Sequence, residues 1–253
     1  MGDWDRARFY EVDGEQYPSV TTVLDIISKP ALGPWYAREE RKYLLAAMGE
    51  ALRAKVPHKK ILALIAELAK EKKAADRAKD KAANIGTQVH KMIEYTIRRQ
   101  LKLKVEERPA MSEAALRVFK SWERWWKRSK IRPLKIETRV HCVGCGYAGT
   151  MDLLAEQNGK AVVLDWKTSK GIYWEMLLQN IAYRHACRKM GIKTYGGILV
   201  RIPKTEDESE VEIHPVKKGE VSFDAFKHAL GLWRKQRAHE GREAGVVPKG
   251  ECK

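Results

Sequence analysis

The chain has 253 residues, of which 44% are hydrophobic and 32% are charged, and its formal net charge is +16. This composition is typical of a folded globular protein and excludes a disordered chain, and no apolar run is long enough to span a bilayer. The positive charge predicts a polyanionic partner, either nucleic acid or an anionic membrane; eight Trp and nine Tyr favour nucleic acid, because flat rings stack on bases.

The N-terminal residues lack the apolar stretch of a signal peptide, so we expect a cytoplasmic protein. Residues 8–17 are arranged around Asp13-Gly14, a pair that favours a tight turn, and they predict a β-hairpin. We expect a short helix to follow, with Ser19 or Thr21 as its N-cap and with its end at Lys29-Pro30.

Helices are predicted to make up most of the remaining first half. The spacing of apolar residues indicates helices over residues 35–55, 84–100 and 112–130, and one that begins at about His58. Residues 70–82 are highly charged and carry no large apolar group. They are typical of a solvated helix face, a mobile linker or a DNA-facing surface.

The second half is predicted to consist mainly of strands. Asn158-Gly159 predicts a hairpin between two of them, and a helix over about residues 173–190 interrupts the series. A last helix, over residues 223–239, precedes a tail that we expect to be loose. The expected strands cover residues 135–142, 147–156, 160–169, 195–203 and 210–216. This order predicts an α/β fold with a mixed central β-sheet flanked by helices.

Three charged side chains are predicted to meet where two of these strands lie side by side. Asp165 and Lys167 are two positions apart on one strand and therefore point to the same face. Asp152 lies on the preceding strand, which the hairpin at Asn158-Gly159 folds back against the first. Two carboxylates and an ammonium group then converge, although an isolated Asp-x-Lys is commonly a salt bridge on an exposed edge strand.

Such a cluster suits the hydrolysis of phosphodiester bonds. Carboxylates bind hard divalent ions such as Mg²⁺ or Mn²⁺, which polarise a phosphoryl oxygen, activate a water and stabilise the leaving oxygen. A neighbouring lysine orients the attacking water or offsets developing negative charge. This chemistry makes the cluster a candidate site for a metal-dependent nuclease.

Five ordered features of the chain resemble the PD-(D/E)XK nuclease superfamily, specifically its RecB-like branch. Within that branch the chain is similar to the single-strand exonucleases typified by the mitochondrial genome-maintenance exonuclease and related phage exonucleases. Each feature is weak alone, but their order and spacing make the set specific. The features are PSVTTVL at residues 18–24, GTQVH at 86–90, GTMD at 149–152, DWK at 165–167, and Gln179 with Tyr183 four residues later.

The resemblance implies a restriction-endonuclease-like core and assigns roles to single residues. Asp152 and Asp165 would be metal ligands, and Lys167 would be the catalytic lysine. The backbone carbonyl of Trp166 would also face the metal. His90 matches a histidine that ligates or flanks a metal in this branch, whereas a lone inward-facing histidine is more often a hydrogen-bonded core residue.

Weaker assignments concern the surroundings of the metal. By the resemblance, Gln179 and Tyr183 would order the active site or contact DNA, and Thr168 and Ser19 are further candidates for substrate binding. Glu137 is a candidate for an acidic residue that some members supply before the GTMD strand. Without the resemblance, Gln179 and Tyr183 would be a polar stripe on a surface helix and Thr168 would simply end its strand.

The four cysteines are expected to form neither a disulfide framework nor an iron–sulfur cluster. His141-Cys142-x-x-Cys145 resembles half of a zinc knuckle, but no second pair follows at metal-binding spacing, which favours a turn into the GTMD strand. Some members of the RecB-like branch carry an iron–sulfur cluster on four cysteines. Here Cys252 is the second-last residue, and no closely spaced C-terminal triplet accompanies it.

Two surface features are expected to contact DNA. The basic segments 70–82 and 98–104 would guide the strand through its backbone charge. Trp122, Trp125 and Trp126 cannot all face one core, so we expect Trp125 at the helix surface, where its ring is able to stack on a base.

The sequence predicts a single nuclease domain, with a mainly helical part that arches over the site, a catalytic sheet core, and a C-terminal helix with a loose tail. These parts cover residues 1–130, 131–220 and 221–253. The predicted function is DNA hydrolysis by a Mg²⁺- or Mn²⁺-dependent exonuclease that prefers single strands and leaves 5′-phosphates, in replication, recombination or repair. Two alternatives stay open: a structure-specific or double-strand endonuclease on the same core, and a non-catalytic nucleic-acid-binding protein.

Overall fold

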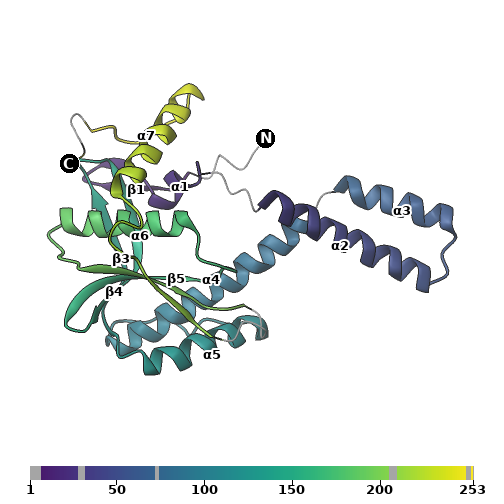
Figure 1. The fold of residues 1–253 in the computed structure, drawn as a ribbon, viewed down its shortest axis with the longest axis horizontal. Coiled ribbons are helices and arrows are strands. Elements are labelled where there is room, and N and C mark those ends of the chain that lie inside the picture. Colours follow the sequence, from purple (N-terminus) through teal and green to yellow (C-terminus); the bar gives the residue numbers. More distant parts are fainter. Residues whose placement is uncertain (1–6, 28–31, 72–73, 205–209, 249–251, 253) are drawn as a thin grey trace. The chain divides into compact units, whose positions relative to one another are not determined.

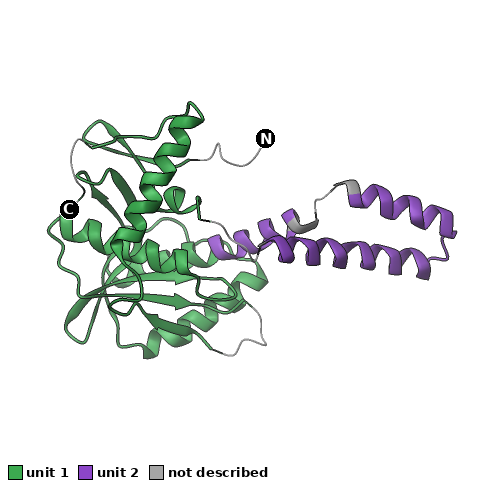
Figure 2. Cartoon of the chain, turned by 45° about the horizontal axis from the view of Figure 1, so that its top comes forward, with its two compact units in different colours: residues 1–27, 88–253 green, residues 28–87 purple. Residues whose placement is uncertain are grey.

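The computed structural model of the chain describes residues 7–27, 32–71, 74–204, 210–248 and 252 (Figure 1). These residues form two compact units (Figure 2). Unit 1 comprises residues 1–27 and 88–253, and unit 2 comprises residues 28–87. Within the described parts of both units, no helix is long and apolar enough to cross a membrane.

Unit 1 is built on a five-stranded sheet in the order β3-β4-β5-β6-β7. β5 pairs with β6 in parallel and all other neighbours are antiparallel, so the predicted mixed sheet is confirmed. The turn between β4 and β5 is tight because Asn158 and Gly159 have φ angles of 51° and 73°. The strands are β3 (Arg132–Cys142), β4 (Tyr147–Gln157), β5 (Lys160–Lys167), β6 (Gly196–Arg201) and β7 (Glu212–Pro215).

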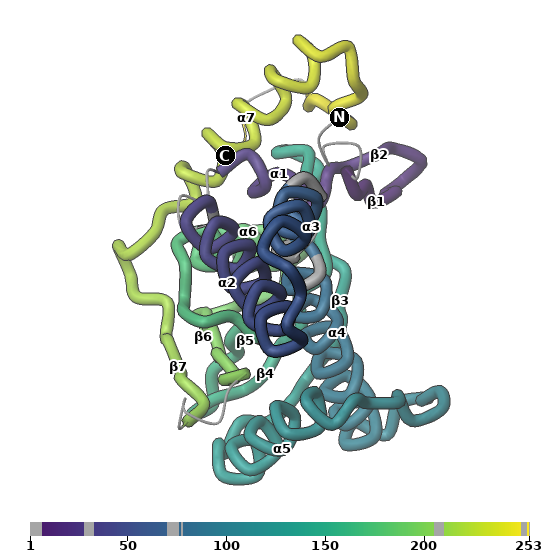
Figure 3. The backbone as a smooth tube through the Cα atoms, turned by 90° about the vertical axis from the view of Figure 1, so that its right-hand side faces the viewer, coloured from purple at the N-terminus to yellow at the C-terminus, as the bar shows by residue number. Residues whose placement is uncertain are grey.

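Helices cover both faces of this sheet (Figures 1 and 3). The helix α6 (Trp174–Lys189) packs on one face, and α5 (Glu113–Arg128) packs on the other beside the C-terminal half of α4 (Ala74–Gln100). The short helix α1 (Val20–Leu24) and the helix α7 (Phe223–His239) pack against α6. This is the predicted α/β arrangement of a restriction-endonuclease-like core.

The predicted N-terminal hairpin and helix cap are confirmed. The strands β1 (Phe9–Val12) and β2 (Glu15–Pro18) pair around Asp13-Gly14, where both residues have positive φ angles. Ser19 is the N-cap of α1, and its hydroxyl accepts a hydrogen bond of 3.0 Å from the backbone N–H of Thr22. The helix ends at Leu24 with Asp25 as its C-cap, earlier than the predicted end at Lys29-Pro30, which lies outside the described residues.

Unit 2 is helical. The helices α2 (Leu32–Arg53) and α3 (His58–Glu71) pack against each other (Figure 2), and the first turns of α4 complete the unit. Residues 72–73 of the predicted DNA-facing segment 70–82 lie outside the described residues, and 74–82 belong to α4. Residues 88–130 group with the sheet in unit 1.

The C-terminal tail is anchored, contrary to the prediction of a loose tail. The Nη2 atom of Arg234 donates to the carbonyl groups of Cys145, Gly146 and Val246 at 3.2, 2.7 and 2.8 Å. Further along the tail, Cys252 forms a disulfide with Cys145. We expected no disulfide framework from the four scattered cysteines, and no local sequence pattern shows that the chain after α7 returns to the β3–β4 turn.

Three tryptophans of α5 surround the ring of Trp166, contrary to the prediction that they could not share one core. Their ring centroids lie 5.8, 6.1 and 5.9 Å from that of Trp166, each ring meeting it edge to face; they are Trp122, Trp125 and Trp126. Trp125 is only 8% exposed, so it is not the surface ring that we expected. The reason is that Trp166 projects a fourth large ring from β5 into this cluster.

The substitution Trp122→Ala is expected to lower the free energy of unfolding by about 3–5 kcal/mol, because it opens a large cavity under β5. Trp174→Ala, which removes a ring that is 50% exposed, is expected to cost less than about 1 kcal/mol. Urea unfolding followed by circular dichroism measures both. Equal losses for the two variants would contradict a supporting role for the tryptophan cluster.

Candidate active site

Three carboxylates lie side by side on neighbouring strands of unit 1. The strand registers place Glu137 of β3 beside Asp152 of β4, and Asp152 beside Asp165 of β5. We call these three residues the acidic row. Glu137 has a φ angle of 45°, a left-handed conformation that is rare for a residue within a strand. The structure thus brings the weakly predicted Glu137 together with the two predicted metal ligands.

Asp165 is completely buried. Its Oδ2 atom forms an ion pair with Nζ of Lys167, two positions along the same strand face. Its Oδ1 atom accepts no hydrogen bond from the residues that the structure describes. A buried carboxylate oxygen without a donor is unfavourable, so this atom is suited to bind a cation.

Lys167 is held from two sides. Besides the ion pair with Asp165, its Nζ donates a hydrogen bond of 2.7 Å to Oε1 of Gln179 on α6. Nε2 of Gln179 in turn donates to the hydroxyl of Tyr183 at 3.1 Å. The two α6 residues therefore position the lysine, whose side chain remains 16% exposed.

Gly149, the first residue of the GTMD motif, allows β4 and α6 to approach closely. A Cβ atom at this position would lie 2.6 Å from Cε1 of Tyr183 and 3.4 Å from a methyl group of Val20. Only glycine leaves room for the tyrosine ring here. Gly149 thus leaves space for Tyr183, whose hydroxyl binds Gln179, and Gln179 in turn holds Lys167.

Asp152 and His90 both contact the backbone of Trp166. Oδ2 of Asp152 accepts a hydrogen bond of 2.8 Å from the backbone N–H of Trp166, and it lies 3.8 Å from Nδ1 of His90. His90, on α4, also hydrogen-bonds to the backbone of Trp166. Burial lowers the pKa of His90. The charge of Asp152 raises this pKa, and the charge of Lys167 lowers it further. The lowered pKa favours the neutral imidazole, which is the form that binds metals.

The acidic row is electrostatically crowded. Burial, followed by the charges of Asp152 and Glu94, raises the pKa of Glu137 to about 8. Burial and the charge of Asp152 also raise the pKa of Asp165, against the opposing charge of Lys167. Carboxylates that repel one another in a poorly hydrated place are stabilised in their charged form by a divalent cation, so the donor set fits such an ion.

The remaining candidates lie at the margin of the site. Thr168 directly follows β5 and is partly exposed, and the next hydroxyl, that of Ser169, donates to the carbonyl of Gly171 at 2.6 Å. Ser19 is 2% exposed, and its hydroxyl is used in the cap of α1. Among the predicted substrate-binding residues, Gln179 and Tyr183 alone join the network around Lys167.

Two further positively charged side chains shift pKa values at the site, and no sequence motif marks them. Arg8, which directly precedes β1, opposes the rise in the pKa of Glu137 and that of Tyr183. Lys204, which follows β6, contributes to the lowered pKa of His90. Both residues reach the site through the fold alone, since neither lies within the five motifs.

A cavity of about 660 Å³ lies along the C-terminal half of α4 and the loop that follows it. Its wall includes Lys91, Tyr95, Arg98 and Lys104, two of which come from the predicted basic segment 98–104. Glu94 also lines it, and the charge of Glu94 reaches Glu137 of the acidic row. The cavity therefore combines basic side chains and an aromatic ring with the carboxylates of Glu94, Glu106 and Glu107, and Arg98 is ion-paired with Glu94.

The model of the PD-(D/E)XK nuclease superfamily matches residues 58–253. Among solved structures, the chain is similar to the "Putative exonuclease" of Eubacterium rectale, with 14% identity, a TM-score of 0.41 and coverage of 67% of this chain and 76% of that one. It is also similar to SSO0001, with 13% identity, a TM-score of 0.30 and coverage of 63% and 75%. A search of curated proteins returned no match.

In metal-free protein, the free energy of unfolding is expected to fall as the pH rises from about 4.5 to about 8. In the unfolded state Glu137 releases its proton near the ordinary pKa of glutamate, whereas in the folded state it keeps the proton up to a pH of about 8. The free energy of unfolding therefore falls as the pH rises from the unfolded-state pKa to the folded-state pKa. Glu137→Gln is expected to flatten this decline by on the order of 1–2 kcal/mol, which allows for screening by solvent.

Urea unfolding in EDTA at several pH values measures the decline. Glu113→Gln, at a position that is 89% exposed, serves as the control and should keep the slope of the original protein. Parallel curves for the original protein and Glu137→Gln would show that Glu137 holds no such proton.

Proposed function

Because the chain belongs to the PD-(D/E)XK nuclease superfamily, we propose that it is a metal-dependent DNA exonuclease that prefers single strands. The observation that carries the proposal is the acidic row, in which a buried Asp165 with an unpaired oxygen is paired with a positioned lysine. A protein that only binds nucleic acid has no use for clustered carboxylates beside a phosphate backbone.

Asp152 and Asp165 would hold Mg²⁺ or Mn²⁺, together with the backbone carbonyl of Trp166. Glu137 and His90 lie beside them and would complete the surroundings of the ion. Oxygen ligands of this kind suit hard divalent cations. When bound, the ion supplies Lewis-acid chemistry to the phosphodiester and to a water.

Lys167 would contact the reacting phosphate or the attacking water. Its ammonium group offsets the negative charge that develops as the water attacks in line and the phosphodiester bond breaks. Gln179 would act as a positioning residue because it accepts a hydrogen bond from the lysine, and Tyr183 would support it because its hydroxyl accepts a hydrogen bond from Gln179. Hydrolysis would leave a 5′-phosphate and a 3′-hydroxyl, as the family resemblance implies.

The cavity along α4 is the proposed path of the DNA strand. Lys91, Arg98 and Lys104 would pair with phosphates, and Tyr95 offers a ring to a base. Stacking of this kind requires unpaired bases, which favours single strands. Phosphate contacts predict binding that weakens steeply with salt.

The direct test uses single-stranded DNA in linear form, labelled separately at each end, and in circular form. With Mg²⁺ we expect loss of label from the linear substrate, no loss in EDTA, and an intact circle. Cleavage of the circle would favour an endonuclease on the same core. Binding without cleavage under any metal would favour a binding protein, and cleavage in EDTA would contradict metal dependence.

Lys167→Met is expected to lower the single-turnover cleavage rate by at least about 100-fold, because the lysine acts on the transition state. The dissociation constant for DNA, measured by fluorescence anisotropy, should change by less than about 3-fold. Lys160→Met, at the exposed start of the same strand, is the matched control and should cleave at the original rate. A variant with weakened binding and unchanged turnover would remove Lys167 from the catalytic group.

A further inference from the structure

A second cluster of metal-binding side chains lies in unit 1, and none of its members belongs to the acidic row. The Sγ atoms of Cys142 and Cys145 and a ring nitrogen of His185 lie within 4.8 Å of one another, and all three residues are buried. Sγ of Cys252 is bonded to that of Cys145, so it lies at the same place. Three elements contribute: the β3–β4 turn, α6 and the C-terminal tail.

The β3–β4 turn presents its two sulfurs in a defined way. The backbone N–H groups of Gly144 and Cys145 hydrogen-bond to the sulfur of Cys142. The N–H of Gly146 donates to the carbonyl of Cys142 at 2.7 Å, and Gly146 has a φ angle of 71°. A Cβ atom on Gly146 would lie 2.8 Å from the carbonyl oxygen of Val246, so the turn and the tail are in close contact.

His185 is held in the tautomer that binds metals. The hydroxyl of Tyr147 donates its one proton to the carbonyl of Ala182 at 2.9 Å, and its oxygen lies 2.9 Å from Nδ1 of His185. Because that proton is used, Nδ1 is assigned as the donor of this pair, which places the proton of the neutral ring on Nδ1. Hydrogen bonding of the second ring nitrogen is the usual companion of metal ligation by histidine.

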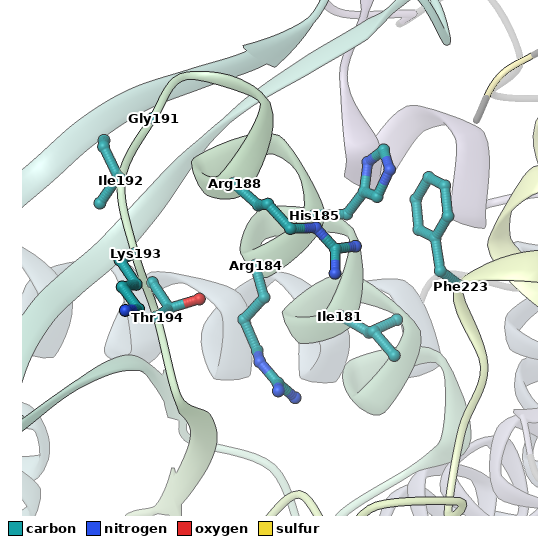
Figure 4. Close-up of a pocket in the computed structure, with 9 residues that line it drawn as sticks. All are labelled: Ile181, Arg184, His185, Arg188, Gly191, Ile192, Lys193, Thr194 and Phe223. Atoms are coloured by element: carbon teal, nitrogen blue, oxygen red, sulfur yellow. The ribbon is translucent and has the colours of Figure 1, made fainter.

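The orientation of the imidazole ring is also fixed by packing. Phe223 stacks on His185 with a centroid separation of 3.6 Å and an interplanar angle of 12°. Figure 4 shows both rings at the edge of a cavity of about 300 Å³.

Specific contacts hold the C-terminal tail close to the cluster of cysteines and His185. Arg234 binds one carbonyl of the tail and two of the β3–β4 turn. The N–H of Val246 donates to the carbonyl of Gln16 at 2.8 Å, and a Cβ atom on Gly245 would lie 2.5 Å from the same oxygen. These contacts bring Cys252, which is far from Cys145 in sequence, to the two cysteines of the turn.

We propose that Cys142, Cys145, Cys252 and His185 bind one Zn²⁺ ion, as a structural site that joins the tail to the β3–β4 turn. Three thiolates and one imidazole form a common tetrahedral zinc site, whereas the acidic row offers the oxygen ligands of Mg²⁺ or Mn²⁺. The sequence shows only the Cys-x-x-Cys half, because the other two ligands come from distant segments. Zinc binding requires the Cys145–Cys252 disulfide of this structure to be reduced first, by two electrons from a thiol reductant, to two thiols that lose their protons as they bind the ion.

The test measures zinc in the full chain, purified with a reductant and without added metal, by elemental mass spectrometry. We expect about one zinc ion per chain and little or none in Cys142→Ser, His185→Ala and Cys252→Ser. Cys252→Ser is the decisive variant, because Cys252 is only partly buried at the margin of the core, and circular dichroism verifies that the variant folds. Reconstitution with Co²⁺ should give strong thiolate-to-cobalt absorption that these variants lose.

Two control variants show whether zinc binding depends on the fourth cysteine or on the acidic row. Cys187→Ala removes that cysteine, which is buried on α6 two residues from His185, and should keep its zinc. Asp165→Asn should also keep its zinc, so failure of the zinc site and failure of the proposed nuclease function are distinguishable.

Three results would overturn the zinc site. The first is a protein without zinc whose peptide map, prepared without reductant, shows the Cys145–Cys252 disulfide. The second is iron with visible absorption in place of zinc. The third is an unchanged zinc content in a folded Cys252→Ser variant.

Discussion

Repulsion among the three carboxylates of the acidic row is the constraint on which the rest of unit 1 depends. Neighbouring strands bring Glu137, Asp152 and Asp165 together, and burial makes their charges costly, as the raised pKa values of Glu137 and Asp165 indicate. Lys167 offsets part of this charge. A divalent cation would offset the remainder, which explains why such an arrangement suits a metal-dependent nuclease.

Trp166 joins the core of the protein to this site. Its ring enters the tryptophan cluster of α5, while its backbone N–H binds Asp152 and its backbone also contacts His90. Because side chains alternate along a strand, Asp165 and Lys167 on either side of it point away from that cluster. A well-packed tryptophan therefore fixes the position of the two charged neighbours on β5.

Features that depend on residues close together in the sequence could be predicted from the sequence alone. Strand alternation and the turn at Asn158-Gly159 predicted that Asp152, Asp165 and Lys167 would meet, and their register places them together. Contacts between segments that are distant in the sequence could not be predicted, because no local sequence pattern marks them. The tryptophan cluster was therefore mispredicted, the Cys145–Cys252 bond and the anchored tail were unexpected, and Arg8 was not found near Glu137.

The most direct test of the account is the rate at which Asp165→Asn cleaves linear single-stranded DNA with saturating Mg²⁺. Asparagine keeps the shape of the buried side chain and removes the charge that the cation requires. The account predicts a loss of at least about 100-fold in single-turnover rate, with folding and DNA affinity preserved. Cleavage by a folded Asp165→Asn variant at the original rate would contradict it, because the acidic row would then not be the catalytic centre.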